Sequence, residues 1–296
     1  MRAGTCCSTT PGPLAIPMQY INRNLVIHRK PIGGGAFGTV FSGTFRGERC
    51  AVKVLNPHAT QLLTSLQAAQ TVQSEALKRF KNECETLKHF KHPNLVRYIT
   101  SCIDPNSNLP LLVMELMNES LTHFLKRCTG ECSNILPTRT QVSLSLNIAQ
   151  ALQYIHTKNL LHRDLCSDNV LLQTSPLLAK LSDFGMSRVI DPEDLDKSLT
   201  TLGHREAYLP PEARKINYNE YDSSLDIFSF GVVMVQMVVK VHRIACSVDR
   251  DVYIEEIKNA EAMSPLYNLI TCCVQTNKNS RPNALKISQN LENLSL

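Results

Sequence analysis

The stretch Leu161-His162-Arg163-Asp164-Leu165-Cys166-Ser167-Asp168-Asn169, followed by Asp183-Phe184-Gly185, decides the fold of this chain. Between its two parts lie apolar runs at residues 170–172 and 177–181, separated by polar and turn-forming residues. Short apolar runs bounded by turn residues predict the two strands of a small hairpin. The hairpin would bring the end of the first quoted part close to the start of the second.

Three polar side chains would then face one space. Asn169 stands where the first strand begins, Asp183 follows the end of the second strand, and Asp164 lies just upstream. Mg²⁺ takes oxygen ligands and leaves positions for phosphate, so one carboxylate and one amide form a suitable metal pair. Asp164 could then accept a proton from a hydroxyl group. Either half alone is explained more simply by acidic residues and an Asn in turns, but both halves at this spacing indicate a site.

These residues match the signatures H-R-D-L-x-x-x-N and D-F-G, and the sequence resembles a eukaryotic protein kinase over about residues 25–294. The resemblance implies an α+β, two-lobed fold with a β-rich N-lobe carrying one helix and a mainly helical C-lobe. We expect a flexible, Pro-punctuated tail at residues 1–22 and a kinase domain at 23–296. The domain divides into an N-lobe at about 23–116, a hinge at about 115–119 and a C-lobe at about 120–296.

Composition agrees with a globular enzyme. Of the 296 residues 43% are hydrophobic and 19% charged, and the net charge of +5 is spread along the chain, so we expect no nucleic-acid role. The longest apolar run, residues 232–239, is too short to span a membrane. The first 20 residues hold no continuous apolar core, so we expect no signal peptide, a cytoplasmic location and eleven reduced cysteines without a metal site. Nothing in the sequence predicts an oligomeric state.

A glycine loop precedes the predicted site. The run Ile32-Gly33-Gly34-Gly35-Ala36-Phe37-Gly38-Thr39-Val40 matches G-x-G-x-x-G-x-V. That pattern alone is weak, because dinucleotide-binding folds use the same glycines before a helix. Here residues 39–45 alternate like a strand, and no Gly-Lys-Ser/Thr completes the rival P-loop motif. A glycine loop inside a strand hairpin would let backbone N–H groups lie over phosphates.

Lys53 lies in an otherwise apolar predicted strand, and a buried Lys needs an anionic partner. Apolar residues at helical spacing predict a helix within residues 76–89: Leu77, Phe80, Cys84 and Leu87. Glu83 would lie at the edge of its buried face, where it could meet Lys53 as the equivalent pair does in kinases. Without Lys53, a solvated carboxylate would be the better interpretation of Glu83. The segment 56–74 is longer than usual, and either extends the helix or forms a mobile loop.

The resemblance implies roles for the remaining site residues, with ATP and Mg²⁺ as cofactors and a protein as the substrate. Asp183 and Asn169 would bind Mg²⁺, Lys53 oriented by Glu83 would hold the α- and β-phosphates, and Asp164, beside Arg163, would orient the acceptor hydroxyl. Met114 occupies the gatekeeper position, and the hinge backbone at Glu115 and Met117 would meet the adenine. The full set of expected ATP-binding residues is Ile32, Gly33, Gly34, Gly35, Ala36, Gly38, Val40, Ala51, Lys53, Met114, Glu115, Met117 and Leu171.

Downstream motifs follow in the order the resemblance requires. A polar segment after Gly185 contains candidate phosphorylation sites at Ser198, Thr200 and Thr201. Phosphate there could pair with Arg163, although these hydroxyls could equally be solvated loop residues. Next come Pro210-Pro211-Glu212, a variant of A-P-E, and residues 226–231, which match D-x-W-S-x-G with Phe228 in the Trp place. Arg281 is the expected partner of Glu212.

Three departures bear on the acceptor. Cys166 stands where serine/threonine kinases usually carry Lys, His204-Arg205 replace a Gly-Thr ahead of Tyr208, and residues 241–251 are short and lack the usual Gly and Pro. The catalytic loop, residues 162–169, most resembles that of the tyrosine-kinase-like group, such as LIM-domain kinases. We therefore expect a kinase that favours Ser/Thr, with Tyr or dual specificity open. The alternative is a pseudokinase that binds ATP as a scaffold, but pseudokinases commonly lose Lys53, Asp164 or Asp183 equivalents, and all three are present.

Overall fold

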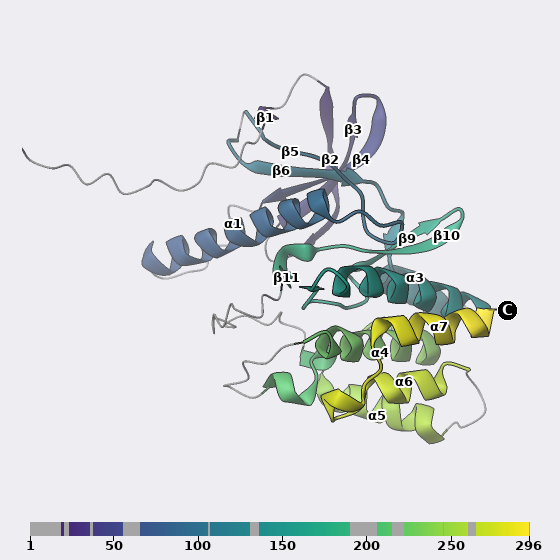
Figure 1. Ribbon diagram of the computed structural model, residues 1–296. Helices are drawn as coiled ribbons and strands as arrows, with labels where there is room; N and C mark the ends of the chain where they lie inside the picture. The colour runs from purple at the N-terminus through teal and green to yellow at the C-terminus, as the bar shows by residue number, and fades with distance from the viewer. Residues whose placement is uncertain are drawn as a thin grey trace, which may run out of the picture.

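The computed structural model describes residues 19–20, 24–35, 38–55, 66–105, 107–130, 136–189, 206–214, 222–244, 246–259 and 265–295. These residues form a sheet-rich N-terminal half and a helical C-terminal half, stacked one above the other in Figure 1. The α+β, two-lobed architecture that the sequence predicts is confirmed. The candidate phosphorylation sites Ser198, Thr200 and Thr201, as well as Ala36, His204 and Arg205, lie outside the described residues.

One six-stranded sheet builds the N-terminal half, in the order β1-β5-β6-β4-β3-β2. All neighbouring strands are antiparallel except β1 and β5. Gly35 and Gly38 are paired across β2 and β3, so the glycine motif does lie in a hairpin. The strands are β1 (Gln19–Tyr20), β2 (Leu25–Gly35), β3 (Gly38–Phe45), β4 (Glu48–Leu55), β5 (Tyr98–Ile103) and β6 (Pro110–Glu115).

Strand β1 was not expected from the sequence. Both of its residues fall within the predicted tail, whereas the structure pairs Gln19 with Cys102 and Tyr20 with Ile103 in parallel. Main-chain hydrogen bonding of this kind leaves little trace in the sequence, because it requires no particular side chain. The pairing closes one edge of the sheet beside β5.

Among the described residues of this half, the one large helix is α1 (Leu66–His89), and it packs against β4, β5 and residues 184–186 (Figure 1). Its buried side recurs every three to four residues, at Ala76, Phe80, Cys84 and Leu87. This is the amphipathic pattern of a helix with one face in a core. The predicted helix is confirmed, and it begins ten residues earlier than residue 76, which favours the extended-helix alternative for residues 66–74.

The C-terminal half is organised around α4 (Ser224–Val239), which is buried along almost its whole length. Its all-round apolar sequence is what a helix surrounded by other helices requires. At Gly231 an added Cβ would lie 2.7 Å from the Val274 side chain and 2.9 Å from Cys273, so glycine permits the close approach of α6. The other helices are α2 (Leu121–Gly130), α3 (Thr138–His156), α5 (Ser247–Asn259), α6 (Tyr267–Cys273) and α7 (Ala284–Ser295).

Short elements connect the two halves and carry the site. The predicted hairpin is present as β9 (Val170–Thr174) and β10 (Leu177–Leu181), with Val170 opposite Leu181. Strand β9 also pairs with β7 (Glu119–Ser120), and β8 (Leu160–Leu161) pairs with β11 (Arg188–Val189). The described residues also form four 3-10 turns: η2 (Phe184–Met186), η3 (Glu206–Tyr208), η4 (Pro211–Arg214) and η5 (Lys278–Ser280).

The predicted pair of Arg281 and Glu212 is present as a bidentate ion pair. Its Nη1–Oε1 and Nη2–Oε2 distances are 2.5 and 2.9 Å. The Arg281 guanidinium carbon lies 4.9 Å from the centroid of the Phe228 ring, and that of Arg250 lies 5.2 Å from the same centroid. Phe228 therefore lies within cation–π distance of two guanidinium groups, although it replaces the Trp of the family motif.

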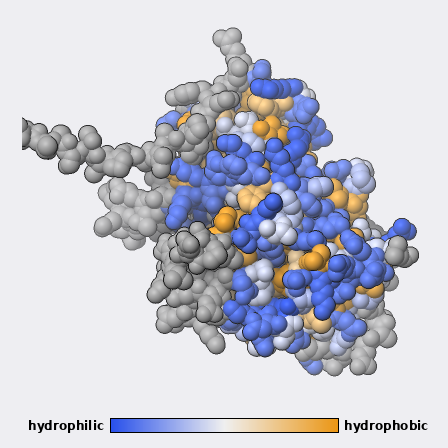
Figure 2. All heavy atoms as spheres, viewed as in Figure 1, coloured by the Kyte–Doolittle hydropathy of each residue, from blue (hydrophilic) through white to orange (hydrophobic). Residues whose placement is uncertain are grey.

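The visible surface is mostly hydrophilic. In Figure 2 the apolar side chains, in orange, occur singly or in small groups among blue ones. Within the described part of the chain, no helix is both long and apolar enough to cross a membrane.

Candidate active site

A cavity of about 970 Å³ collects residues from both halves of the molecule. Its walls include the catalytic-loop residues Asp164 and Asn169, and also Glu83 and Asp183. Of the predicted ATP-binding residues, these line it: Ile32, Gly33, Gly34, Gly38, Val40, Ala51, Lys53, Met114, Glu115, Met117 and Leu171. Gly35 ends β2 and is not among the lining residues, and neither is Arg163. Most of the predicted ATP-binding residues therefore line one shared cavity.

Two glycines of the loop differ in what they require. A Cβ added at Gly38 would lie 2.9 Å from the Val54 carbonyl oxygen, closer than side-chain atoms normally come to the backbone. At Gly33 the nearest atom to an added Cβ is the Val40 Cβ, at 4.0 Å. Gly38 is thus needed for the close pairing of β3 with β4. At Gly33 a side chain would fit but would occupy space at the rim of the cleft.

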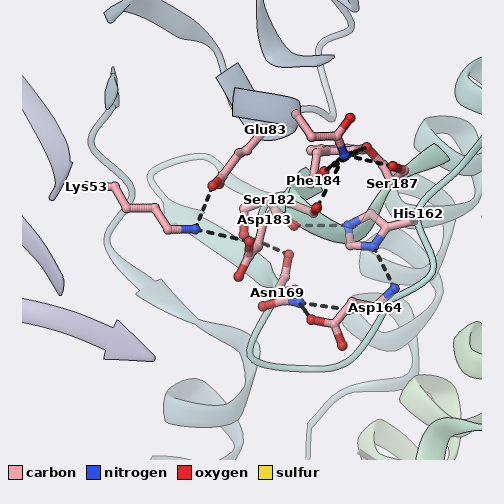
Figure 3. A network of polar contacts seen from close by, with 11 residues as sticks. Lys53, Glu83, His162, Asp164, Asn169, Ser182, Asp183, Phe184 and Ser187 are labelled. Atoms are coloured by element: carbon pink, nitrogen blue, oxygen red, sulfur yellow. Dashed lines mark hydrogen bonds and ion pairs between the residues drawn. The ribbon is translucent and has the colours of Figure 1, made fainter. Parts of the chain in front are cut away.

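Lys53, on β4, joins two carboxylates from distant parts of the chain (Figure 3). Its Nζ lies 2.7 Å from Glu83 Oε2 on α1 and 3.0 Å from Asp183 Oδ1 after β10. The contact between Lys53 and Glu83 is the one that the sequence predicts. The Glu83 side chain is 3% exposed and that of Asp183 is 44% exposed. Both carboxylates line the cavity, but that of Asp183 is far more accessible to a ligand in the cleft.

The charges of this trio shift one another's pKa values. Burial opposes the charge of Lys53, but attraction to Asp183 and Glu83 outweighs it and raises the pKa of Lys53 above its usual value. Burial likewise opposes the charge of Asp183, yet Lys53 holds the pKa of Asp183 below its usual value. For Glu83 burial wins and raises the pKa to about 7, in spite of the attraction to Lys53. Lys53 and Asp183 are thus kept charged at neutral pH.

The catalytic loop is fixed from below by the buried carboxylate of Asp226, on α4. Its oxygens accept hydrogen bonds from the backbone N–H groups of His162 at 2.8 Å and Arg163 at 2.9 Å, and lie 2.9 Å from His156 Nε2. Burial would raise the pKa of Asp226, but the bonds from His156 and His162 hold it below its usual value. Arg163 has a φ of +66°, a conformation that typically costs about 1–3 kcal/mol in a non-glycine residue. The bonds to Asp226 offset that cost.

His162 connects the catalytic loop to the segment after β10. Its Nδ1 accepts the backbone N–H of Asp164 at 3.3 Å, so that nitrogen carries no proton. The proton is then on Nε2, which lies 3.0 Å from the Ser182 carbonyl oxygen and donates to it (Figure 3). The ring also packs against Phe184, with centroids 4.7 Å apart. The positions of Asp164 and Asp183 are thereby linked.

Asn169 and Asp183 lie together as the hairpin predicts. Both the backbone N–H and the hydroxyl of Ser182, next to Asp183, donate to the Asn169 carbonyl at 2.9 Å. The Asn169 side-chain amide donates to Asp164 twice, at 2.7 Å to the carbonyl and 3.1 Å to the carboxylate. With its nitrogen turned to Asp164, Asn169 has its amide oxygen left for a cation.

The described residues contain no cluster of three or more His, Cys, Asp or Glu that could hold a metal without further ligands. One carboxylate and one amide oxygen suit Mg²⁺, which commonly takes few protein ligands and completes its shell with phosphate and water.

The hinge contains an ion pair that sequence reasoning missed. Lys180 Nζ, on β10, lies 2.7 and 3.0 Å from the two carboxylate oxygens of Glu115. Glu115 Oε1 also accepts the backbone N–H of Arg97 at 2.7 Å. The Glu115 backbone N–H in turn donates to the Arg97 carbonyl oxygen at 3.0 Å, so both the carboxylate and the N–H of Glu115 are engaged within the protein. Alternation along residues 177–181 was the available signal, because it places Lys180 on the face opposite Ala179.

A line of hydroxyl groups runs beneath the region where the sequence departs from serine/threonine kinases. Tyr208 Oη donates to Gln236 Oε1 at 2.8 Å, so it accepts from Ser167 Oγ at 3.2 Å. Ser167 in turn accepts from Thr122 Oγ1 at 2.8 Å. These bonds join the catalytic loop directly to the segment that contains Tyr208. The catalytic loop is therefore bonded to the Tyr208 segment although Cys166 replaces the usual Lys.

A cleft between a β-rich lobe and a helical lobe, lined by this Lys, Asp and Asn set, defines a protein kinase domain. A profile described as "Protein tyrosine and serine/threonine kinase" matches residues 25–291. The chain belongs to this protein kinase family.

Three curated relatives illustrate the similarity. The chain is 31% identical over 220 residues to a probable serine/threonine-protein kinase, kinY, of Dictyostelium discoideum, covering 71% of this chain and 36% of that protein. It is 28% identical to the dual specificity protein kinase shkE of the same organism, covering 95% and 38%. It is 34% identical to the LysM domain receptor-like kinase 10 of Oryza sativa subsp. japonica, covering 70% and 30%. The chain thus spans about a third of the length of these relatives.

Proposed function

We propose that this chain is an active ATP-dependent protein kinase that transfers the γ-phosphate to a protein hydroxyl group. The observation that carries the proposal is the convergence of Lys53, Asp164, Asn169 and Asp183 on one cleft. Phosphoryl transfer requires mainly positioning and neutralisation of charge, and these four side chains supply both. All four would be needed for transfer, whereas a scaffold that only binds ATP would not need Asp164.

Each residue has a role that its contacts support. Lys53 would leave Asp183 to bind the α- and β-phosphates, while Glu83 keeps it in place. Asp183 and the amide oxygen of Asn169 would hold Mg²⁺, which neutralises phosphate charge when bound. Asp164, restrained by the Asn169 amide, would orient the acceptor hydroxyl and take its proton. The main chain at Glu115 and Met117 would meet the adenine, with Val40, Ala51 and Leu171 around it.

We propose Ser or Thr as the favoured acceptor, with activity on Tyr open. The relatives named above include serine/threonine and dual specificity kinases. The bonds of Ser167 with Tyr208 restrain the acceptor side of the catalytic loop in the absence of the usual Lys. Phosphorylation at Ser198, Thr200 or Thr201 would raise activity by pairing with Arg163.

A transfer assay tests the proposal. The purified chain is incubated with Mg-ATP, alone and with generic protein substrates, and phosphate incorporation is compared with that of Asp164→Asn. Asn keeps the size of the side chain but cannot take the acceptor proton, so incorporation should fall by about 10²-fold or more. Phosphoamino-acid analysis of the product gives the acceptor, and phosphotyrosine as the main product would contradict the Ser/Thr assignment. Nucleotide binding without incorporation in the unsubstituted chain would instead support the scaffold alternative.

A further inference from the structure

Asn82, one residue before Glu83 on α1, makes a set of contacts that the proposed chemistry does not use. Its Nδ2 lies 2.7 Å from the Ser187 carbonyl oxygen, 3.0 Å from that of Phe184 and 3.3 Å from that of Gly185. An amide nitrogen has two N–H groups, so the two shorter contacts are the principal bonds. Asn82 thus holds the main chain that directly follows Asp183.

A second bond joins the same two segments one helical turn later. The Ser187 hydroxyl donates to the Phe184 carbonyl at 2.7 Å, so it accepts from Thr86 Oγ1 at 3.1 Å (Figure 3 shows Phe184 and Ser187). Thr86 and Ser187 are both buried. Asn82 and Thr86 are four residues apart and therefore lie on one face of α1. That face is fixed to the turn η2 at two points.

These bonds depend on the conformation of the turn. They end on main-chain oxygens, and η2 presents those oxygens together only while Asp183 keeps its φ of +60° and the turn stays closed by the bond from Ser187 N to the Phe184 carbonyl. A different path of the segment after Asp183 would direct the oxygens elsewhere. Asn82 therefore makes its bonds to the segment after Asp183 only in the arrangement that also brings Asp183 to Lys53.

A further connection between α1 and this segment passes through ligand-binding groups. Lys53 bridges Glu83 and Asp183, but the proposed reaction directs Lys53 to phosphate and Asp183 to Mg²⁺. That bridge is weakened when both are engaged. Asn82, Phe184 and Ser187 are not among the residues that line the cleft, although Gly185 is, so a nucleotide in the cleft would not compete for the two principal bonds of Asn82.

We propose that Asn82 is a positioning residue that keeps α1, and with it Glu83, docked on the segment after Asp183 while nucleotide and metal occupy Lys53 and Asp183. The proposal rests on the proposed function for its kinetic consequence. Its structural consequence, the docking of α1, does not depend on transfer.

The sharpest variant is Asn82→Asp, which keeps the shape of the side chain but places a carboxylate among three carbonyl oxygens. We expect kcat to fall by about 10- to 100-fold, because two hydrogen bonds are lost and repulsion is added. The KM for ATP should change by less than about threefold, since Asn82 does not line the cleft. Asn82→Ala, which only removes the bonds, should cost about tenfold, and Thr86→Val somewhat less. The matched control is Asn268→Asp, at an exposed position on α6.

A double-substitution cycle separates positioning from a general loss of structure. If Asn82 acts by placing Glu83, then Asn82→Ala should have little further effect on kcat in a Glu83→Gln chain. An equal fold-loss in both backgrounds would overturn the proposal. So would a kcat for Asn82→Asp within twofold of the unsubstituted chain.

Hydrogen exchange gives a measurement that does not require activity. In the presence of Mg²⁺ and a non-hydrolysable ATP analogue, Asn82→Asp should exchange faster than the unsubstituted chain over residues 77–89 and 183–189, while the helices of the C-terminal half stay unchanged. If the unsubstituted chain transfers no phosphate but Asn82→Asp still exchanges faster in these two regions, the proposed function is refuted and the role of Asn82 is retained. Unchanged exchange in both regions would refute the role of Asn82 alone.

Discussion

Two buried ion pairs, Lys53–Glu83 in the N-terminal half and Arg281–Glu212 in the C-terminal half, join segments far apart in the sequence and are built differently. Lys53 makes one bond to Glu83 and a second to the half-exposed Asp183. Arg281 makes two bonds to one carboxylate, donates to the main-chain carbonyls of Gln275 and Ser224, and lies over Phe228. The Arg281 side chain is completely buried.

The difference follows from what each cation does. A guanidinium with five donors in a fixed plane suits a permanent attachment, because every donor can be satisfied at once. An ammonium on a flexible stem can exchange one partner for another without strain. The Arg281 pair therefore belongs to the framework of the helical half, and the Lys53 pair belongs to the working cleft. Removing the Arg281–Glu212 pair should lower the stability of the fold, and removing the Lys53–Glu83 pair should lower turnover.

The largest effect is expected for Glu212→Gln, which leaves the buried guanidinium of Arg281 without a counter-charge. Breaking one partner of a buried pair typically costs about 3–5 kcal/mol in the free energy of unfolding. Urea denaturation followed by circular dichroism measures the loss. The double variant Glu212→Gln with Arg281→Met should recover part of it, because no buried charge then remains. Equal destabilisation in the single and double variants would contradict this account.

Lys53→Met should show the opposite pattern. Loss of one charged contact to the nucleotide phosphates in a water-poor cleft typically lowers turnover by about 10²–10³-fold. The free energy of unfolding should change little, because Met fills the same space and Glu83 can take up a proton. Single-turnover kinetics and thermal unfolding of the same preparation test both parts. Wild-type turnover in this variant would remove Lys53 from the proposed site.

The smallest effect concerns pH. Burial raises the pKa of Glu83 from 4.5 to about 7, so the folded chain holds this proton more tightly than the unfolded chain. The resulting stabilisation is complete below about pH 4.5 and is lost as the pH rises through about 7. Glu83→Gln cannot titrate, so its free energy of unfolding relative to the unsubstituted chain should improve by about 3 kcal/mol between pH 4.5 and 8. Denaturation at a series of pH values checks this, and a difference independent of pH would show that Glu83 stays charged throughout.

The charged part of the site was predictable because its residues have fixed types at fixed spacings. The hairpin predicted that Asp164, Asn169 and Asp183 lie close together. A charge in an apolar strand demands a partner, which predicted the pair of Lys53 with Glu83. The resemblance to kinases placed both groups in one cleft and paired Glu212 with Arg281.

The neutral contacts were not predictable in the same way. Asn82 binds main-chain oxygens, and a main-chain acceptor has no residue type that could be recognised in the sequence. The bonds of Ser167 with Tyr208 depend on how two loops are folded together. A weak signal did exist at Asn82, because Asn is a poor helix former and stands here in the middle of a predicted helix. The parallel pairing of β1 left no comparable signal.

The contact of the buried Phe228 ring with two guanidinium groups has an optical consequence. The chain contains eight Tyr and no Trp, so its intrinsic fluorescence comes from phenol rings alone. Phe228→Trp would restore the residue of the family motif and introduce a single indole at the centre of the helical half. The emission of this indole would report on that half only and would not respond to nucleotide-induced changes around Lys53. Loosening of the helical framework could thus be followed by the emission wavelength, separately from events in the cleft.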